Sequence, residues 1–191
     1  MSIKNWKKEI LTIPNMLSLF RLILIPIYIA IYLNAQEDSD YYLAAGILAV
    51  SCLTDLVDGK IARHFNMVST IGKILDPLAD KATQLTLIVC LALKHSALWY
   101  IVAIFVVKEG FQVIAGGITF RKGRMLKGAL ISGKICTAVL FLSLILMVMI
   151  PRIPERGIFG IAIVDAIFML IAFYNYLITY FGKSNKFQDL D

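Results

Sequence analysis

The chain has 191 residues, of which 59% are hydrophobic and 17% are charged, and its mean hydropathy is +0.79. Soluble domains are about 45–50% apolar and about 25% charged, so this composition excludes a disordered chain, a fibrous protein and most soluble enzymes. It predicts an integral membrane protein. The net charge of +6 then indicates an anionic membrane surface or a phosphorylated ligand as the partner, and not a nucleic acid.

The chain begins with a polar stretch that we do not expect to be a cleaved signal peptide, because the apolar run after it continues without a small-residue cleavage site. Residues 3–11 combine Trp6 with Lys4, Lys7 and Lys8, which predicts a short amphipathic helix on the membrane surface. A membrane-spanning helix needs about 20 mostly apolar residues. Six later stretches meet this requirement if a few polar residues are allowed. They are residues 15–34, 41–63, 73–93, 97–120, 130–150 and 158–181.

The predicted fold is therefore all-α: an integral membrane protein with six transmembrane helices, forming one domain over residues 1–191. The distribution of basic residues predicts its orientation, because cytoplasmic loops are rich in lysine and arginine. Three basic residues fall on one side: Lys94, Arg152 and Arg156. Twelve fall on the other: Lys4, Lys7, Lys8, Lys60, Arg63, Lys73, Arg121, Lys122, Arg124, Lys127, Lys183 and Lys186. Both termini are thus expected on the cytoplasmic side of the cell membrane.

The three cysteines carry little functional information. Cys52, Cys90 and Cys136 all lie in apolar runs, and no CxxC pair is present. We expect buried thiols, not disulfides or metal ligands.

Four aspartates at the ends of the second and third predicted spans are the strongest chemical signal. Asp55 and Asp58 are three residues apart, and Asp76 and Asp80 are four apart, so each pair lies on one face of its helix. The two helices form a hairpin, so all four carboxylates are expected to converge. A lone aspartate at mid-bilayer costs about 2.5–3.5 kcal/mol, so we expect a wet cytoplasmic cavity with divalent cations between them. Carboxylate-only ligation favours Mg²⁺ or Mn²⁺, and four acids are enough for two ions.

The spacing around these acids resembles a known signature. Asp55-x-x-Asp58-Gly59-x-x-Ala62-Arg63, followed after eight residues by Gly72-x-x-x-Asp76-x-x-x-Asp80, is similar to the signature of the CDP-alcohol phosphotransferase family. The run from Ile13 to Arg21 and the run from Leu75 to Lys81 resemble the bacterial phosphatidylglycerophosphate synthase branch. The second run also resembles that of CMP-forming cardiolipin synthases.

The resemblance implies roles for individual residues. Asp55, Asp58 and Asp76 would hold the metal ions, and Asp80 would ligate one ion and act as the general base. Cytidine-nucleotide binding would fall to Gly59, Ala62, Arg63 and Gly72, and we expect Asn15, Ser18 and Arg21 to reach the same cavity. The resemblance also implies a homodimer.

An acceptor that carries its own phosphate needs cations and their partners nearby. Our candidates for acceptor binding are Lys81, Lys108, Glu109, Arg121 and Lys134. Lys108 and Lys134 lie within apolar stretches and are expected to face the cavity or a partner. Neighbouring helix residues diverge, so Lys108 and Glu109 need not pair. The related branch usually has Arg-Glu at this point and a further arginine near Gly116, so this chain departs from that pattern.

The expected activity is the joining of CDP-diacylglycerol to sn-glycerol 3-phosphate, giving phosphatidylglycerophosphate and CMP. A related alternative uses phosphatidylglycerol as the acceptor and makes cardiolipin. A transporter is a second class, because intramembrane acids also mark ion paths, but it predicts acids at several depths. A structural scaffold gives no reason for the spacing of the acids.

Overall fold

The computed structural model describes residues 13–64, 72–126, 128, 130–150, 152–182 and 187–189. For residues 13, 14, 52, 55–64, 72–76, 125, 188 and 189 the description covers the backbone alone. The surface helix predicted over residues 3–11 lies outside the described residues. The chain divides into two compact units, residues 1–90 with 148–151, and residues 91–147 with 152–191, and each is described by itself.

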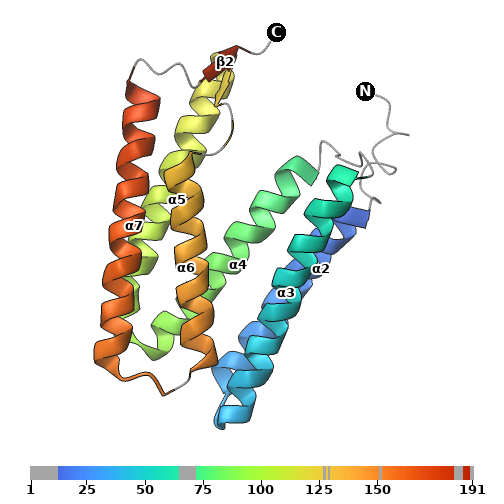
Figure 1. The fold of residues 1–191 in the computed structure, drawn as a ribbon, viewed down its shortest axis with the longest axis vertical. Helices are drawn as coiled ribbons and strands as arrows, with labels where there is room; N and C mark the ends of the chain where they lie inside the picture. The colour runs from blue at the N-terminus through green and yellow to red at the C-terminus, as the bar shows by residue number, and fades with distance from the viewer. Residues whose placement is uncertain are drawn as a thin grey trace. The chain divides into compact units, whose positions relative to one another are not determined.

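The first unit is built on a helical hairpin of α2 (Ile13–Asn34) and α3 (Asp38–His64), followed by the greater part of α4 (Gly72–Lys94). Figure 1 shows α2 and α3 running side by side, in blue and cyan. The rings of Tyr28 and Tyr32 stack with centroids 5.4 Å apart, and Tyr41 meets Tyr32 edge-on at 5.7 Å. These aromatic contacts join the two helices of the hairpin near the short connection between them.

A carboxylate closes the first turn of α3. The Asp40 side chain accepts hydrogen bonds from the backbone N–H groups of Gln36 at 3.0 Å and Glu37 at 3.1 Å. This satisfies donors that a helix start leaves without intrahelical partners. The same two hydrogen bonds lower the pKa of the Asp40 carboxyl below its ordinary value, because they stabilise the charged form.

The second unit contains three long helices and a small ribbon. The 3₁₀ turn η1 (Ser96–Leu98) leads into α5 (Trp99–Arg121), and α6 (Ile131–Met149) and α7 (Glu155–Phe181) follow. On the side where α5 ends, strand β1 (Arg124–Leu126) pairs antiparallel with β2 (Phe187–Asp189), with Arg124 opposite Asp189. The ribbon was not predicted, so the prediction of an all-α chain is correct for the long elements only.

The connection around β1 depends on glycine. Gly123 and Gly128 have φ angles of 73° and 93°, in the left-handed region that other residues rarely adopt. They turn the chain out of α5 and on toward α6. The connection thereby brings β1 to the segment that follows α7.

Four helical segments have the length and composition of membrane spans among the described residues. They are Asn15–Asn34, Ser96–Arg121, Ile131–Met149 and Glu155–Phe181, with mean hydropathies of 2.1, 1.8, 2.2 and 2.3. Many large apolar side chains on them are exposed, including Val113 at 74% and Leu142 at 72%, as expected for lipid-facing surfaces. Six spans are not confirmed, because α3 and α4 are not among the four.

The prediction of buried thiols is confirmed for Cys90 and Cys136, which are buried and form no disulfide. The side chain of Cys52 is outside the described part.

Candidate active site

Three polar side chains form a buried strip on α2. Asn15, Ser18 and Arg21 are only 2%, 0% and 3% exposed. Steps of three residues keep them close to one face of the helix. An arginine buried on an apolar helix is costly without a counter-charge, so the strip requires an acidic partner from another element.

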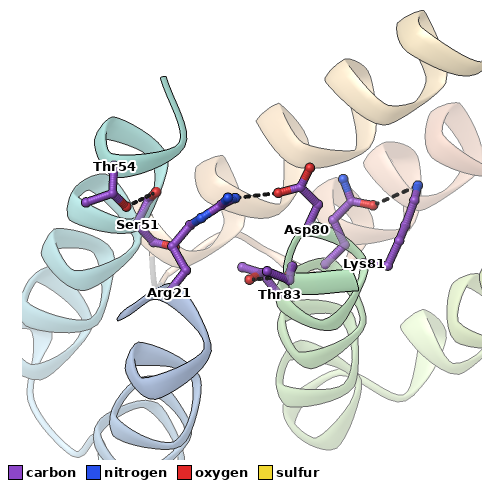
Figure 2. Close-up of polar contacts among 8 residues, drawn as sticks. Arg21, Ser51, Thr54, Asp80, Lys81 and Thr83 are labelled. Atoms are coloured by element: carbon purple, nitrogen blue, oxygen red, sulfur yellow. Dashed lines mark hydrogen bonds and ion pairs between the residues drawn. The ribbon is translucent and has the colours of Figure 1, made fainter. Parts of the chain in front are cut away.

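Asp80 on α4 supplies that counter-charge. The Arg21 guanidinium donates through Nη1 to the Asp80 carboxylate Oδ1, and the two residues form an ion pair (Figure 2). The Arg21 side chain is 3% exposed, whereas that of Asp80 is 43% exposed. The Asp80 carboxylate is therefore held by a buried cation, while its side chain stays partly exposed. Of the predicted nucleotide-site residues on α2, Arg21 is directly linked to the signature.

The α4 residues next to Asp80 add further buried polar groups. Thr83 Oγ1 donates to the carbonyl of Ala79 at 2.8 Å, and Lys81 Nζ lies 3.5 Å from Gln84 Oε1. Thr83 and Gln84 are 8% and 4% exposed. The sequence analysis missed both residues, although Gln84 follows Asp80 by one helical turn and a period of four would have identified it.

The backbone places the signature on two helices, as predicted. Asp55 and Asp58 lie near the end of α3, and Asp76 and Asp80 lie in the first half of α4. Of the four acids, only Asp80 has its side chain within the described part of the structure. The side chains of Gly59, Ala62, Arg63 and Gly72 also fall outside it, so the roles predicted for these residues stay predictions.

A divalent metal is therefore tested here only at Asp80. Its carboxylate is an oxygen ligand of the kind that Mg²⁺ and Mn²⁺ prefer, and its side chain is partly exposed. Within the residues that the structure describes, no three His, Cys, Asp or Glu side chains come together as a metal site. The donor at Asp80 fits the ion, and the remaining ligands are still predicted from the sequence.

The predicted acceptor residues differ in their surroundings. Lys108 is 3% exposed, and its Nζ lies 2.5 Å from Glu109 Oε1. The sequence left this pairing open, and the two neighbours do pair in the structure, because both side chains are long enough to bend toward each other along the helix. The expectation that Lys108 faces a partner is confirmed. Arg121 and Lys134 are exposed, and Lys81 is half-buried.

Lys81 belongs to the first unit, and Lys108, Glu109, Arg121 and Lys134 belong to the second. Their convergence on one acceptor site stays a prediction.

Comparison with known proteins gives the family. A sequence model described as CDP-alcohol phosphatidyltransferase matches residues 11–178. The chain is 33% identical over 118 residues to a protein of Streptomyces coelicolor named cardiolipin synthase (CMP-forming), covering 60% of this chain and 54% of the relative. It is 40% identical over 92 residues, 47% of this chain and 14% of the relative, to a cardiolipin synthase and mitochondrial hydrolase fusion protein of Schizosaccharomyces pombe.

A third relative is named for the other of the two activities that the sequence resemblance implied, the transfer to glycerol 3-phosphate. The chain is 35% identical over 89 residues, 47% of this chain and 45% of the relative, to a CDP-diacylglycerol–glycerol-3-phosphate 3-phosphatidyltransferase of Pseudomonas fluorescens. In all three cases the match spans about half or less of the relative's length. Because the family match covers most of the chain and contains the whole acid signature, this protein belongs to the CDP-alcohol phosphatidyltransferase family.

Proposed function

We propose that this protein is a membrane phosphatidyltransferase that moves the phosphatidyl group of CDP-diacylglycerol to an alcohol hydroxyl and releases CMP. The observation that carries the proposal is the eight-residue signature on α3 and α4, with Asp80 held by Arg21 across the helices. Family membership supports the nucleotide-activated donor.

Asp80 takes the acceptor proton in this proposal. The acceptor hydroxyl attacks the β-phosphorus of the donor, and a base must accept its proton as the P–O bond forms. The partly exposed Asp80 carboxylate is available for that proton, and Arg21 fixes the direction of the carboxylate. CMP departs with the electrons of the broken P–O bond.

The acids Asp55, Asp58, Asp76 and Asp80 would hold two Mg²⁺ or Mn²⁺ ions. When bound, such ions neutralise charge that develops on the diphosphate oxygens. Gly59, Ala62, Arg63 and Gly72 would accept the cytidine nucleotide, together with the buried strip Asn15, Ser18 and Arg21. The excess of basic residues on one side supports a cytoplasmic site, and the family resemblance supports a homodimer.

The acceptor we propose first is sn-glycerol 3-phosphate, which gives phosphatidylglycerophosphate. The runs 13–21 and 75–81 and the name of the Pseudomonas relative support it. A second candidate, phosphatidylglycerol, is favoured by a specific observation: Lys108 is paired with Glu109, and the lower net positive charge suits a singly charged phosphodiester better than the doubly charged phosphate monoester of glycerol 3-phosphate. The names of the Streptomyces and Schizosaccharomyces relatives also support this second acceptor.

One acceptor panel tests both proposals. The purified protein, in detergent with CDP-diacylglycerol and Mg²⁺, is offered glycerol 3-phosphate, phosphatidylglycerol, inositol or serine, and CMP release is measured. We expect CMP with glycerol 3-phosphate, and loss of the signal with a chelator that Mg²⁺ or Mn²⁺ in excess restores. CMP with phosphatidylglycerol alone selects cardiolipin synthesis. No CMP with any hydroxyl acceptor would refute the phosphatidyltransferase.

A further inference from the structure

A groove lies between α6 and α7 of the second unit, on residues to which the proposed reaction assigns no role. Its volume is about 460 Å³, within the range of about 300–1,000 Å³ that is usual for small-molecule sites. Its walls are mostly aliphatic and include Leu142, Leu146, Ile161 and Val164. Such walls favour an apolar occupant.

The groove is open because α7 carries glycine where a side chain would fill it. A Cβ placed on Gly160 meets no atom within 4 Å. Leu142 and Val164 beside the opening are 72% and 46% exposed. Both helices are candidate membrane spans, so exposed apolar residues on them face lipid. A molecule would therefore enter the groove from the lipid phase.

One acidic residue is among those that line the groove. Asp165 lines it, although the residue as a whole is only 1% exposed. The Ser143 hydroxyl Oγ lies 2.7 Å from both Asp165 carboxyl oxygens and 3.0 Å from the carbonyl oxygens of Val139 and Leu140. Four possible acceptors thus surround a single hydroxyl group.

A protonated Asp165 accounts for this arrangement. A serine hydroxyl donates one hydrogen bond and accepts up to two, and serine in an apolar helix commonly donates to a carbonyl of the preceding turn. If Ser143 does so, the close carboxyl contact needs a proton from Asp165, which then donates to Ser143 Oγ. Among the residues that the structure describes, no lysine, arginine or histidine pairs with Asp165. A charged aspartate at this depth would cost about 2.5–3.5 kcal/mol.

We propose that the α6–α7 groove is a binding site for apolar molecules that carry one basic nitrogen, and that Asp165 meets them there as a protonated carboxylic acid. The aliphatic walls hold the body of the molecule, and the acid proton passes to the nitrogen. Proton transfer leaves a carboxylate and a cationic nitrogen in contact, so each charge is compensated where it is buried. This site is independent of the proposed transferase.

An apolar carbodiimide is the matched chemical probe. Dicyclohexylcarbodiimide partitions into lipid and needs a protonated carboxyl. The acid proton moves to one carbodiimide nitrogen, the carboxylate oxygen bonds to the central carbon, and the resulting O-acylisourea rearranges to a stable N-acylurea. No group leaves, so the peptide gains the mass of the whole reagent. The full chain in liposomes is treated and digested, and the modified residue is identified by mass spectrometry.

We expect an adduct on Asp165, and at least fivefold less of it with a water-soluble carbodiimide at equal concentration. Gly160→Leu fills the groove and should reduce the adduct at least fivefold. Gly117→Leu is the matched control, because Gly117 on α5 also has no atom within 4 Å of its Cβ position, and it should leave the adduct unchanged. An unlabelled Asp165 in the folded wild-type chain overturns the proposal, as does equal labelling of Gly160→Leu.

Protection of the wild-type chain tests the ligand class without any substitution. N,N-dimethyldodecylamine in the liposomes should slow labelling of Asp165 at least threefold, whereas dodecanol, which has no nitrogen, should not. Equal protection by both compounds contradicts the requirement for a basic nitrogen. Stronger labelling by the water-soluble reagent contradicts entry from the lipid phase.

Discussion

At the scale of single residues, the most informative contact is that between Arg21 and Asp80. The guanidinium is buried and the carboxylate is partly exposed. This asymmetry suits a base that has to meet a substrate, because the buried partner fixes one oxygen while the side chain stays partly exposed. A purely structural ion pair would not need that exposure.

Asp80→Asn should therefore reduce turnover strongly. The amide preserves the size of the side chain but cannot accept the acceptor proton, and general-base catalysis contributes about 10²–10⁴-fold. We expect CMP formation to fall at least a hundredfold, while CMP binding, measured by titration, changes far less. Asp40→Asn, at the first turn of α3, is the matched control and should keep its activity. A near-normal rate for Asp80→Asn would remove Asp80 as the base.

At the scale of helices, close packing of α6 on α7 sets a second test. A Cβ on Gly133 would lie 2.6 Å from Tyr176 Oη and 3.0 Å from a ring carbon of the same side chain. Tyr176 is 5% exposed, so its ring has little room to move. The contact depends on the missing side chain of Gly133.

Gly133→Ala should destabilise the protein by about 1–3 kcal/mol, the usual cost of overpacking. Gly160→Ala, on the facing helix but with no atom within 4 Å, should be neutral or stabilise by about 0.5–1 kcal/mol, because alanine restricts the unfolded chain. The midpoint of thermal unfolding in detergent should fall for Gly133→Ala and should stay equal or rise for Gly160→Ala. A lower midpoint for both variants would mean that helix packing at Gly133 is not the cause.

The long helices were predictable because their signals are local. The stretch predicted at 15–34 corresponds to α2, Ile13–Asn34, and the stretch at 130–150 to α6, Ile131–Met149, since apolar runs and polar ends lie in one continuous segment. The ribbon of β1 and β2 was not predictable, because it joins Arg124 to Asp189 through backbone pairing that no local pattern encodes. Four signature residues of the site were also fixed by local spacing on α3 and α4: Asp55, Asp58, Asp76 and Asp80.

The pairing of polar side chains with one another was harder to predict than the residues of the site themselves. Arg21 and Asp80 are 59 residues apart, and Ser143 and Asp165 are 22 apart. Sequence analysis assigned Arg21 and Asp80 to the same cavity, but it did not identify them as partners of each other. Long-range pairing depends on how helices pack, and single-sequence periodicity does not contain that information.

At the scale of the whole molecule, the number of membrane crossings decides where the signature lies. Four segments qualify as spans by length and composition. The helices α3 and α4 have 27 and 23 residues, long enough for a hydrocarbon core of about 30 Å at about 1.5 Å per residue. We propose that both cross the membrane, which would place the end of α3 in the cytoplasm.

Single cysteines test this topology. In a chain with Cys52, Cys90 and Cys136 replaced by alanine, Ser39→Cys before the α3 crossing should react with an impermeant maleimide on intact bacterial cells. His64→Cys, at the end of α3, should react only after permeabilisation. Reaction of both on intact cells would mean that α3 does not cross, and the signature would then lie on the outer side.

The pairing of Arg21 with Asp80 also constrains how the chain is made. Synthesis proceeds at about 5–20 residues per second, so the carboxylate that Arg21 contacts is produced roughly 3–12 seconds later, 59 residues further on. During that interval α2 has to be held by the insertion machinery or at the lipid headgroups, where its guanidinium stays hydrated. We therefore expect that α2 is released into the lipid only after α4 has emerged from the ribosome.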